Sequence, residues 1–285
     1  MSNSIYIRVP AGYGDSLMAT AVIAAVKRQM PRLRVFIVTR KTDIYLHNPN
    51  ITACYNTRIV LKRNRSIYER CCVFEYDRYD RLRELCSRKH YIDYFYDCLP
   101  FKIEERMYKP QIYLSKKERD YKRRSMLDLH RPMVAISPYG GQSTRIPNKF
   151  YPVEKWPDII EGLRDAGVTV LQFGRKKEGG HLPGTVDFRN IGYRRSAAVL
   201  AHCDAMVTHP SGFMHLATAL DVPSVTLFGG VEDPLVGGYE VNFNMTVDLP
   251  CAPCWLPRPC ESPVCREELS PEKIVNKILE VVKEG

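Results

Sequence analysis

Val207–Gly238, VTHPSGFMHLATALDVPSVTLFGGVEDPLVGG, is the stretch of this chain that decides the fold. It begins at the end of a short apolar run of strand character, Ala205–Thr208. Pro210-Ser211-Gly212 then supply turn and cap residues, and the small and apolar residues of His215–Leu220 suit a buried helix. Because Ser224–Phe228 is again apolar, the stretch predicts strand, turn, helix and strand, which is half of a nucleotide-binding α/β unit.

A pair of glycines, Gly229 and Gly230, follows the second of these strands. Glycine lets a backbone come close to a ligand, and open α/β sheets bind ligands at the carboxyl ends of their strands. We therefore expect a ligand pocket at this end of the sheet.

Similar patterns recur along the chain, whose 285 residues are 45% hydrophobic and can bury a large core. The N-terminal part predicts a strand, a glycine turn, a helix and a strand, at Ile5–Val9, Gly12–Asp15, Ser16–Met30 and Val35–Thr39. A second series predicts a strand, a helix and a strand, at Val134–Ser137, Val153–Ala166 and Thr169–Phe173. Two further helices are expected around Tyr79–Arg88 and Ser115–Leu127.

Two such series predict an α/β protein with two Rossmann-like doubly wound domains facing each other across a cleft. We expect the N-terminal domain at residues 1–128. Residues 129–285 are expected to form the second domain, with a cysteine-containing loop and a terminal helix.

The net charge of +10 is uneven along the chain. Residues 1–128 hold 26 Lys and Arg against 14 Asp and Glu, whereas residues 129–285 hold 16 against 18. Two basic clusters could attract an anionic partner such as phosphorylated lipid or nucleic acid, and the alternative is an ordinary solvated basic surface. They consist of Arg58, Lys62, Arg63 and Arg65, and of Lys116, Lys117, Arg119, Lys122, Arg123 and Arg124.

No apolar run approaches the roughly 20 residues of a transmembrane helix, and the N-terminus leads directly into a strand rather than a signal peptide. A cytoplasmic location is therefore expected, with peripheral contact at an anionic inner membrane as a further option.

The ten cysteines form two groups. Six are scattered, as expected of reduced thiols that serve as small hydrophobic residues. The other four, Cys251, Cys254, Cys260 and Cys265, follow the pattern C-x2-C-x5-C-x4-C in a proline-rich segment. Four thiolates so spaced favour a structural zinc or iron ion, although free thiols or a disulfide stay open.

Two polar residues follow predicted strands where ligands bind. Asp15 stands at a helix start, where it either contacts a polar ligand or only caps the helix. Lys149 lies in a loop, where it either neutralises a diphosphate leaving group or is an ordinary surface lysine, and Arg145 competes for the same role.

Two further candidates lie later in the chain. Glu178 follows the strand Thr169–Phe173, where a carboxylate could bind ribose hydroxyls. His215 stands near the start of the later helix, where it either contacts phosphate or acts in acid–base chemistry, or packs with a satisfied hydrogen bond.

Several segments together resemble glycosyltransferase family 9, the ADP-heptose:lipopolysaccharide heptosyltransferases and their relatives of the GT-B fold. The resemblance rests on GYGDSL at residues 12–17, KFYP at 149–152 and SGFMHLA at 211–217. LFGG at 227–230, Gly238-Tyr239 and the four-cysteine segment add to it.

This resemblance implies metal-independent transfer of a sugar from a nucleotide-sugar donor, with inversion at the anomeric carbon. Asp15 matches the general base, Lys149 the basic catalytic residue at the donor diphosphate, and Glu178 the acid that binds ribose. The remaining donor-binding matches are Gly14, Ser211, Gly212, Phe213, Met214 and His215. An ADP-sugar is the default donor, with heptose as its sugar, although Pro210 stands where relatives commonly have Asp. The acceptor implied is an anionic glycan or a lipid-linked sugar. The resemblance places acceptor binding in the N-terminal domain (residues 1–128) and nucleotide-sugar binding in residues 129–285.

Other function classes stay open on the same fold, because fold does not fix function. They are a nucleotide-sugar-dependent epimerase and a non-catalytic protein that binds nucleotide sugars. A nucleic-acid-binding metal module is disfavoured, because the four cysteines lie in the acidic part of the chain without interleaved basic and aromatic residues.

Overall fold

The computed structural model describes residues 3–10, 12–75, 89–121, 126, 128–139, 147–256 and 258–284. The chain divides into two compact units, Met1–Asp77 with Lys89–Ser115 (unit 1) and a second that contains Lys116–Gly285 (unit 2). Arg145 and the predicted helix at residues 79–88 lie outside the described residues.

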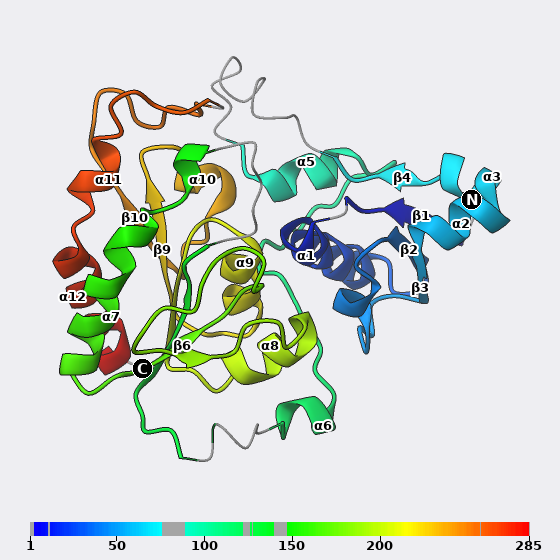
Figure 1. The fold of residues 1–285 in the computed structure, drawn as a ribbon. Helices are drawn as coiled ribbons and strands as arrows, with labels where there is room; N and C mark the ends of the chain where they lie inside the picture. Colours follow the sequence, from blue (N-terminus) through cyan, green and yellow to red (C-terminus); the bar gives the residue numbers. More distant parts are fainter. Residues whose placement is uncertain are drawn as a thin grey trace. The chain divides into compact units, whose positions relative to one another are not determined.

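Unit 1 is built on a parallel four-stranded sheet of order β3-β2-β1-β4 (Figure 1). Its strands are β1 (Ser4–Arg8), β2 (Arg34–Thr39), β3 (Ala53–Asn56) and β4 (Cys72–Val73). Its helices are α1 (Tyr13–Gln29), the 3-10 turn η1 (Thr42–Tyr45), α2 (Thr57–Arg63), α3 (Arg65–Glu69) and α5 (Tyr91–Asp97). The sheet, α1 and the following strand confirm the predicted N-terminal βαβ unit.

Helix α1 begins earlier than the sequence analysis predicted. Tyr13, Gly14 and Asp15 form its first turn instead of a separate glycine turn, and Gly12 is its N-cap residue. The Asp15 side chain explains the difference, because it accepts a hydrogen bond from a backbone N–H at the helix start. Residues Ser16–Val26 are buried, so this helix forms the core of unit 1 together with β1 and β2.

Unit 2 is built on a parallel six-stranded sheet of order β10-β9-β8-β5-β6-β7. Its strands are β5 (Met133–Ser137), β6 (Thr169–Gln172), β7 (Val186–Asp187), β8 (Ala205–Thr208), β9 (Ser224–Gly229) and β10 (Phe243–Thr246). Counted from β5, the order is 3-2-1-4-5-6, which is the strand order of dinucleotide-binding folds.

The helices of unit 2 cover this sheet (Figure 1). They are α6 (Lys116–Arg119), the 3-10 turns η3 (Pro147–Lys149) and η4 (Val153–Lys155), α7 (Trp156–Asp165), α8 (Tyr193–Leu200), α9 (Gly212–Ala219), α10 (Pro234–Gly237), α11 (Cys265–Glu268) and α12 (Pro271–Glu284). The apolar residues of α7 and α12 pack with those of β5, β8 and β9 in one core.

Two helices of unit 2 are shorter than predicted. The predicted helix at Val153–Ala166 starts with a 3-10 turn and becomes α-helical at Trp156, with Pro157 in the first turn, a position where a missing N–H costs nothing. Of the predicted helix at residues 115–127, α6 is α-helical and residues 120 and 121, which follow it, are not, and Glu118 of α6 pairs with Arg194 of α8.

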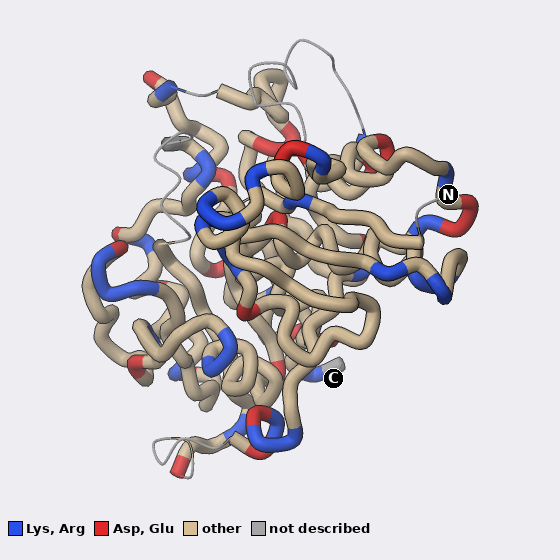
Figure 2. Tube along the Cα trace, turned by 90° about the vertical axis from the view of Figure 1, so that its right-hand side faces the viewer, with Lys and Arg blue, Asp and Glu red and all other residues tan. Residues whose placement is uncertain are grey.

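Acidic and basic positions occur along both units (Figure 2). Within the described ranges, no helix combines the length and the apolar character that crossing a bilayer requires.

Candidate functional site

The strand order of unit 2 reverses between β5 and β8. The chain runs outward from β5 to β6 and β7 on one side, and from β8 to β9 and β10 on the other. In open α/β sheets, ligands bind outside the carboxyl ends of the strands at such a switch point. The segments that follow β5, β8 and β9 are therefore the first place to look for a site.

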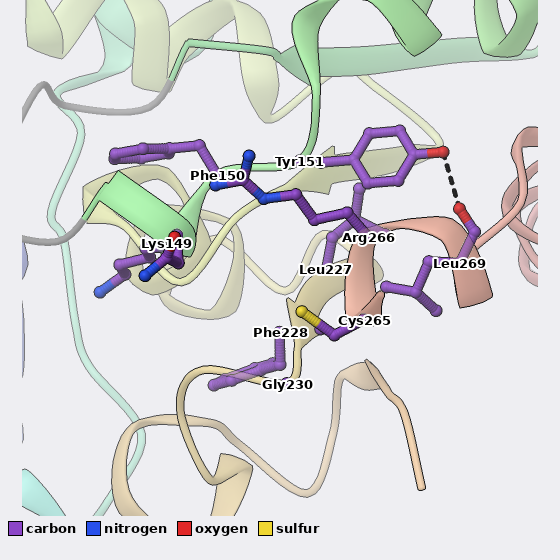
Figure 3. Close-up of a pocket in the computed structure, with 11 residues that line it drawn as sticks. Lys149, Phe150, Tyr151, Leu227, Phe228, Gly230, Cys265, Arg266 and Leu269 are labelled. Atoms are coloured by element: carbon purple, nitrogen blue, oxygen red, sulfur yellow. Dashed lines mark hydrogen bonds between the residues drawn. The ribbon is translucent and has the colours of Figure 1, made fainter. Parts of the chain in front are cut away.

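A pocket lies next to this point and is lined by residues from three separate segments (Figure 3). They come from the approach to α7, from the end of β9 and from α11. The lining residues are Asn148, Lys149, Phe150, Tyr151, Leu227, Phe228, Gly229, Gly230, Cys265, Arg266 and Leu269. Gly229 has a φ of +60°, a left-handed backbone conformation that glycine adopts without strain. A pocket is therefore present at the glycine pair, where the sequence analysis expected one for a ligand.

Lys149 and Glu232 form an ion pair beside this pocket. The distance between Lys149 Nζ and Glu232 Oε1 is 2.8 Å, and the two side chains are 18% and 4% exposed. Burial raises the pKa of Glu232 well above its ordinary value, whereas the ammonium group beside it favours the charged carboxylate. The pair therefore holds a cation at the carboxyl end of the sheet.

His209 connects the Lys149 segment to the end of β8. Its Nε2 accepts a hydrogen bond from the Tyr151 backbone N–H at 2.8 Å, and the ring packs edge-on against Phe150. Burial lowers the pKa of His209 to about 3, and the positive charge of Lys149 adds to this effect. The hydrogen bond with the Ser137 backbone raises the pKa, but by less than the other two effects lower it. The ring is therefore neutral, with its proton on Nδ1.

Helix α9 begins directly after this histidine segment. Ser211 is its N-cap residue and accepts a hydrogen bond from the Phe213 N–H at 3.3 Å. Ser211, Gly212 and Phe213 are half-buried, and Phe213 packs against the aromatic rings of Phe173 and Tyr193. The helix start thus offers backbone N–H groups with an aromatic surface alongside, which suits a phosphate and a base or sugar ring.

The next two residues of the motif point into the core instead. Met214 is 1% exposed and His215 is 7% exposed. His215 Nδ1 lies 2.6 Å from the hydroxyl of Tyr239, and burial raises the pKa of that hydroxyl. His215 is therefore a packed residue with a hydrogen-bond partner, which is one of the two alternatives the sequence left open.

Glu178 lies in the loop after β6, and its side chain is 4% exposed. Its carboxylate accepts a hydrogen bond from the Arg175 N–H at 3.2 Å and pairs with Arg175 Nε at 2.9 Å. A side chain at Gly179 would overlap the ring of Tyr139, so this loop packs tightly against the segment that follows β5. Glu178 is therefore held inside its own loop, close to the carboxyl edge of the sheet.

Asp15 and Gly14 lie in unit 1, in the first turn of α1. Asp15 Oδ2 accepts a hydrogen bond from the Gly12 N–H at 3.2 Å. A side chain at residue 12 would overlap this carboxylate, so glycine is required for the contact. Asp15 is half-buried and caps α1, and a carboxylate can accept several hydrogen bonds at once.

The four cysteines lie in residues 251–265, which we call the cysteine loop. All four are free thiols. Among the described residues, no three His, Cys, Asp or Glu side chains are arranged to hold a metal ion. As the described residues place them, the thiols therefore do not fit a four-thiolate site.

The structure brings Lys149 and the start of α9 to the same edge of one sheet, and it places Asp15 and Gly14 in the other unit. Sequence reasoning missed three residues at that edge: Asn148, His209 and Glu232. His209 directly follows a predicted strand, and Glu232 follows the glycine pair, so their positions carried a signal. Asn148 carried none, since its partners lie more than 100 residues away in the sequence.

Comparison with known proteins adds the family. The model of glycosyltransferase family 9 (heptosyltransferase) matches residues 73–261, which is more than half of the chain. Lipopolysaccharide heptosyltransferase 1 of Pseudomonas aeruginosa is 29% identical over 155 residues, which cover 46% of this chain and 43% of that protein. The chain therefore matches less than half the length of this curated relative.

Solved structures resemble the whole chain. The glycosyltransferase family 9 protein of Veillonella parvula has a TM-score of 0.74 at 14% identity, with 99% and 97% of the two chains covered. The iron-containing dodecameric glycosyltransferase TibC from enterotoxigenic E. coli has a TM-score of 0.72 at 17% identity, with 99% and 76% covered. TibC is also known in complex with ADP-D-β-D-heptose. These likenesses confirm the predicted α/β, GT-B fold class.

Proposed function

Because this chain belongs to glycosyltransferase family 9, we propose that it transfers a sugar from a nucleotide-sugar donor to an acceptor hydroxyl. The observation that carries the proposal is the half-buried Lys149 cation, paired with the buried Glu232, at the carboxyl edge of a 3-2-1-4-5-6 sheet, on the same side as the start of α9. An ADP-sugar, with heptose as the sugar, is the first donor to test, because a structural neighbour was solved with ADP-D-β-D-heptose.

The proposed reaction is a single displacement with inversion. The acceptor oxygen attacks the anomeric carbon of the donor, and the bond from that carbon to the diphosphate oxygen breaks. The acceptor proton passes to the Asp15 carboxylate, and the bonding electrons leave with the diphosphate. Lys149 stabilises the negative charge that develops on this leaving group. No metal ion is required in these steps.

Donor recognition is assigned to residues around the switch point of unit 2. The N–H groups at Gly212 and Phe213 are proposed to hold a phosphate group, with Ser211 beside them. Glu178 is proposed to accept hydrogen bonds from the ribose, which requires it to exchange its contact with Arg175. Met214 and His215 are buried, so they support the helix start through packing instead of direct contact.

The acceptor is proposed to be an anionic glycan or a lipid-linked sugar bound through unit 1. Helix α2 of this unit exposes two apolar side chains, Ile59 at 53% and Leu61 at 42%. Arg58, Lys62 and Arg63 surround them on the same short helix. Exposed apolar residues among basic ones suit peripheral binding to an anionic membrane, where a lipid-linked acceptor would lie.

A structural zinc or iron at the four cysteines is a separate proposal. It is supported by the spacing of the cysteines and by the iron in the neighbour TibC, and it is opposed by the observed arrangement of the thiols. Metal analysis of the purified protein decides between a metal site and free thiols. The site is supported if the natural protein holds about one zinc or iron ion per chain and Cys251→Ser loses it. A folded protein without metal contradicts the site.

The test of the proposed function is a thermal-shift screen against ADP-, GDP-, UDP-, CMP- and dTDP-sugars. A ligand that binds only the folded state raises Tm by mass action. The proposal expects one nucleotide to stand out and expects donor turnover once an acceptor is supplied. Binding without any transfer to lipid-linked or glycan acceptors would favour the non-catalytic alternative.

A further inference from the structure

The segment before α7 is tied to the cysteine loop by one buried side chain. Asn148 is 7% exposed. Its Nδ2 group donates to the backbone carbonyls of Leu256 at 3.3 Å and Arg258 at 2.7 Å, and its Oδ1 accepts from the Cys260 N–H at 3.0 Å. Asn148 therefore joins the two segments through three hydrogen bonds of one buried amide.

The same loop also holds the segment after β9. The Cys254 N–H donates to the Gly230 carbonyl at 3.0 Å, and the Trp255 N–H donates to the Val231 carbonyl at 2.9 Å. Glu232 is the next residue. A side chain at Gly230 would come within 2.8 Å of Cys265 Cβ, so the loop and β9 approach as closely as a glycine allows.

These contacts are made by residues next in sequence to each partner of the Lys149–Glu232 ion pair. Asn148 directly precedes the cation, and the backbone bonds at residues 230 and 231 directly precede the carboxylate. The two charged residues are 83 positions apart in the sequence, and the cysteine loop is bonded to the chain beside each of them. Figure 3 shows the end of β9, Lys149 and Cys265 around the same pocket.

We propose that the cysteine loop, through its hydrogen bonds to Asn148, holds Lys149 in position for the donor diphosphate, with Asn148 as the positioning residue. The loop then contributes to nucleotide affinity without touching the nucleotide. This inference rests on the proposed function, because it takes Lys149 as the diphosphate contact. It assigns a role to the cysteine loop that does not depend on a metal ion.

The experiment is a double-mutant cycle with ADP as the probe, measured by titration calorimetry. Asn148→Ala is expected to weaken ADP binding about tenfold in the natural chain and to have little effect when Lys149→Ala is already present. A residue that merely stabilises the fold would cause the same loss in both backgrounds. Equal losses would therefore overturn the inference.

Two further variants keep the test decisive. Gly230→Ala acts from the β9 side, because its new methyl group pushes against Cys265, and it is expected to weaken ADP binding in the same non-additive way. Asn242→Ala is the matched control, since Asn242 is an equally buried asparagine of unit 2 that bonds only Thr218 in the described contacts of its side chain. It is expected to lower Tm without changing ADP affinity beyond twofold.

The outcomes also separate this inference from the proposed function. If Lys149→Ala leaves ADP affinity unchanged, the assignment of the diphosphate site fails and the inference fails with it. If Lys149→Ala weakens ADP binding while Asn148→Ala and Gly230→Ala do not, only the inference fails.

Discussion

The Asp15 carboxylate accepts a hydrogen bond from the Gly12 backbone N–H, with 3.2 Å between Asp15 Oδ2 and the nitrogen. This contact caps helix α1 at its N-terminus, and the positive end of the helix favours the ionised carboxylate. A cap and a general base can be the same group, because a carboxylate has two oxygens and several lone pairs. Substitutions that keep or remove the cap separate the two roles.

Asp15→Asn keeps an oxygen that can accept the Gly12 hydrogen bond but removes the basic group. We expect it to lower kcat at least about a hundredfold, the usual contribution of general base catalysis, while Tm and donor affinity change little. Asp15→Ala should lose the same activity and about 0.5–1 kcal/mol of stability in addition, because the cap is lost. Full activity in Asp15→Asn would rule out the base assignment and leave only the cap.

Much of the fold could be predicted because the buried strands are short, nearly continuous apolar runs. Ala205–Thr208 and Val134–Ser137 are examples, and both lie in the middle of the sheet of unit 2. The start of α1 was predicted three residues too late, because GYGD is typical of a turn. The side chain of Asp15 supplies the cap that allows the helix to begin at Tyr13.

Sequence reasoning selected candidates for the site by their positions after predicted strands. Lys149 and Ser211 were selected in this way. The partner of Lys149 was not, because Glu232 is 83 residues away and the pair depends on how two loops pack. The three hydrogen bonds of Asn148 likewise join segments 108 to 112 residues apart, which no local pattern encodes.

Lys149→Ala is expected to weaken binding of the nucleotide by about tenfold to a hundredfold, since a charge-assisted hydrogen bond to phosphate contributes about 1.5–3 kcal/mol. It also leaves Glu232 buried without its cation, which destabilises the fold. The double variant Lys149→Ala/Glu232→Gln removes this second effect. Its Tm should recover towards that of the natural protein, while its affinity in calorimetry stays low. Recovery of affinity together with Tm would mean that Lys149 acts through stability alone.

His209 predicts a loss of stability in mild acid. Its pKa is lowered to about 3 in the folded protein, whereas the unfolded chain takes up a proton near pH 6.5. The unfolded state therefore binds the extra proton between these values, and stability falls as the pH drops below about 6.5, by about 2 kcal/mol at pH 5 for this one group. His209→Gln retains an acceptor for the Tyr151 N–H and does not titrate. Urea unfolding at pH 7.5 and pH 5 should show a smaller difference for this variant; an unchanged difference would contradict the assignment.

Asp187 predicts an effect at lower pH with the opposite origin. Its hydrogen bonds with Arg189 lower its pKa to about 2, so the ionised form is stabilised by folding. This contribution is complete above the ordinary carboxyl pKa near 4 and is lost as the pH falls towards about 2. Because Asp187 is 30% exposed, screening by solvent reduces the effect to about 1 kcal/mol. Asp187→Asn should therefore be less stable than the natural protein at pH 7 in urea unfolding, and the gap should narrow as the pH falls towards about 2.

Helix α2 predicts binding to anionic vesicles. Each basic side chain near an anionic membrane contributes about 1 kcal/mol at moderate salt, so replacing Arg58, Lys62 and Arg63 by Gln should reduce partitioning about a hundredfold. Co-sedimentation with vesicles of phosphatidylglycerol and phosphatidylcholine measures the partitioning. Vesicles of pure phosphatidylcholine should bind neither the natural protein nor the triple variant. Ile59→Ser/Leu61→Ser should weaken binding with no change in charge, since these exposed side chains would enter the interface.

The control for net charge lies in unit 2, where α6 carries three basic residues, Lys116, Lys117 and Arg119. Replacing these three by Gln removes the same charge from another helix. If both triple variants lose vesicle binding equally, the attraction reflects the net charge of +10 and not a docking surface. If only the α2 variants lose vesicle binding, α2 is the membrane contact. High salt should then weaken the binding of the natural protein but leave the part due to Ile59 and Leu61, because salt screens charges but not buried apolar area.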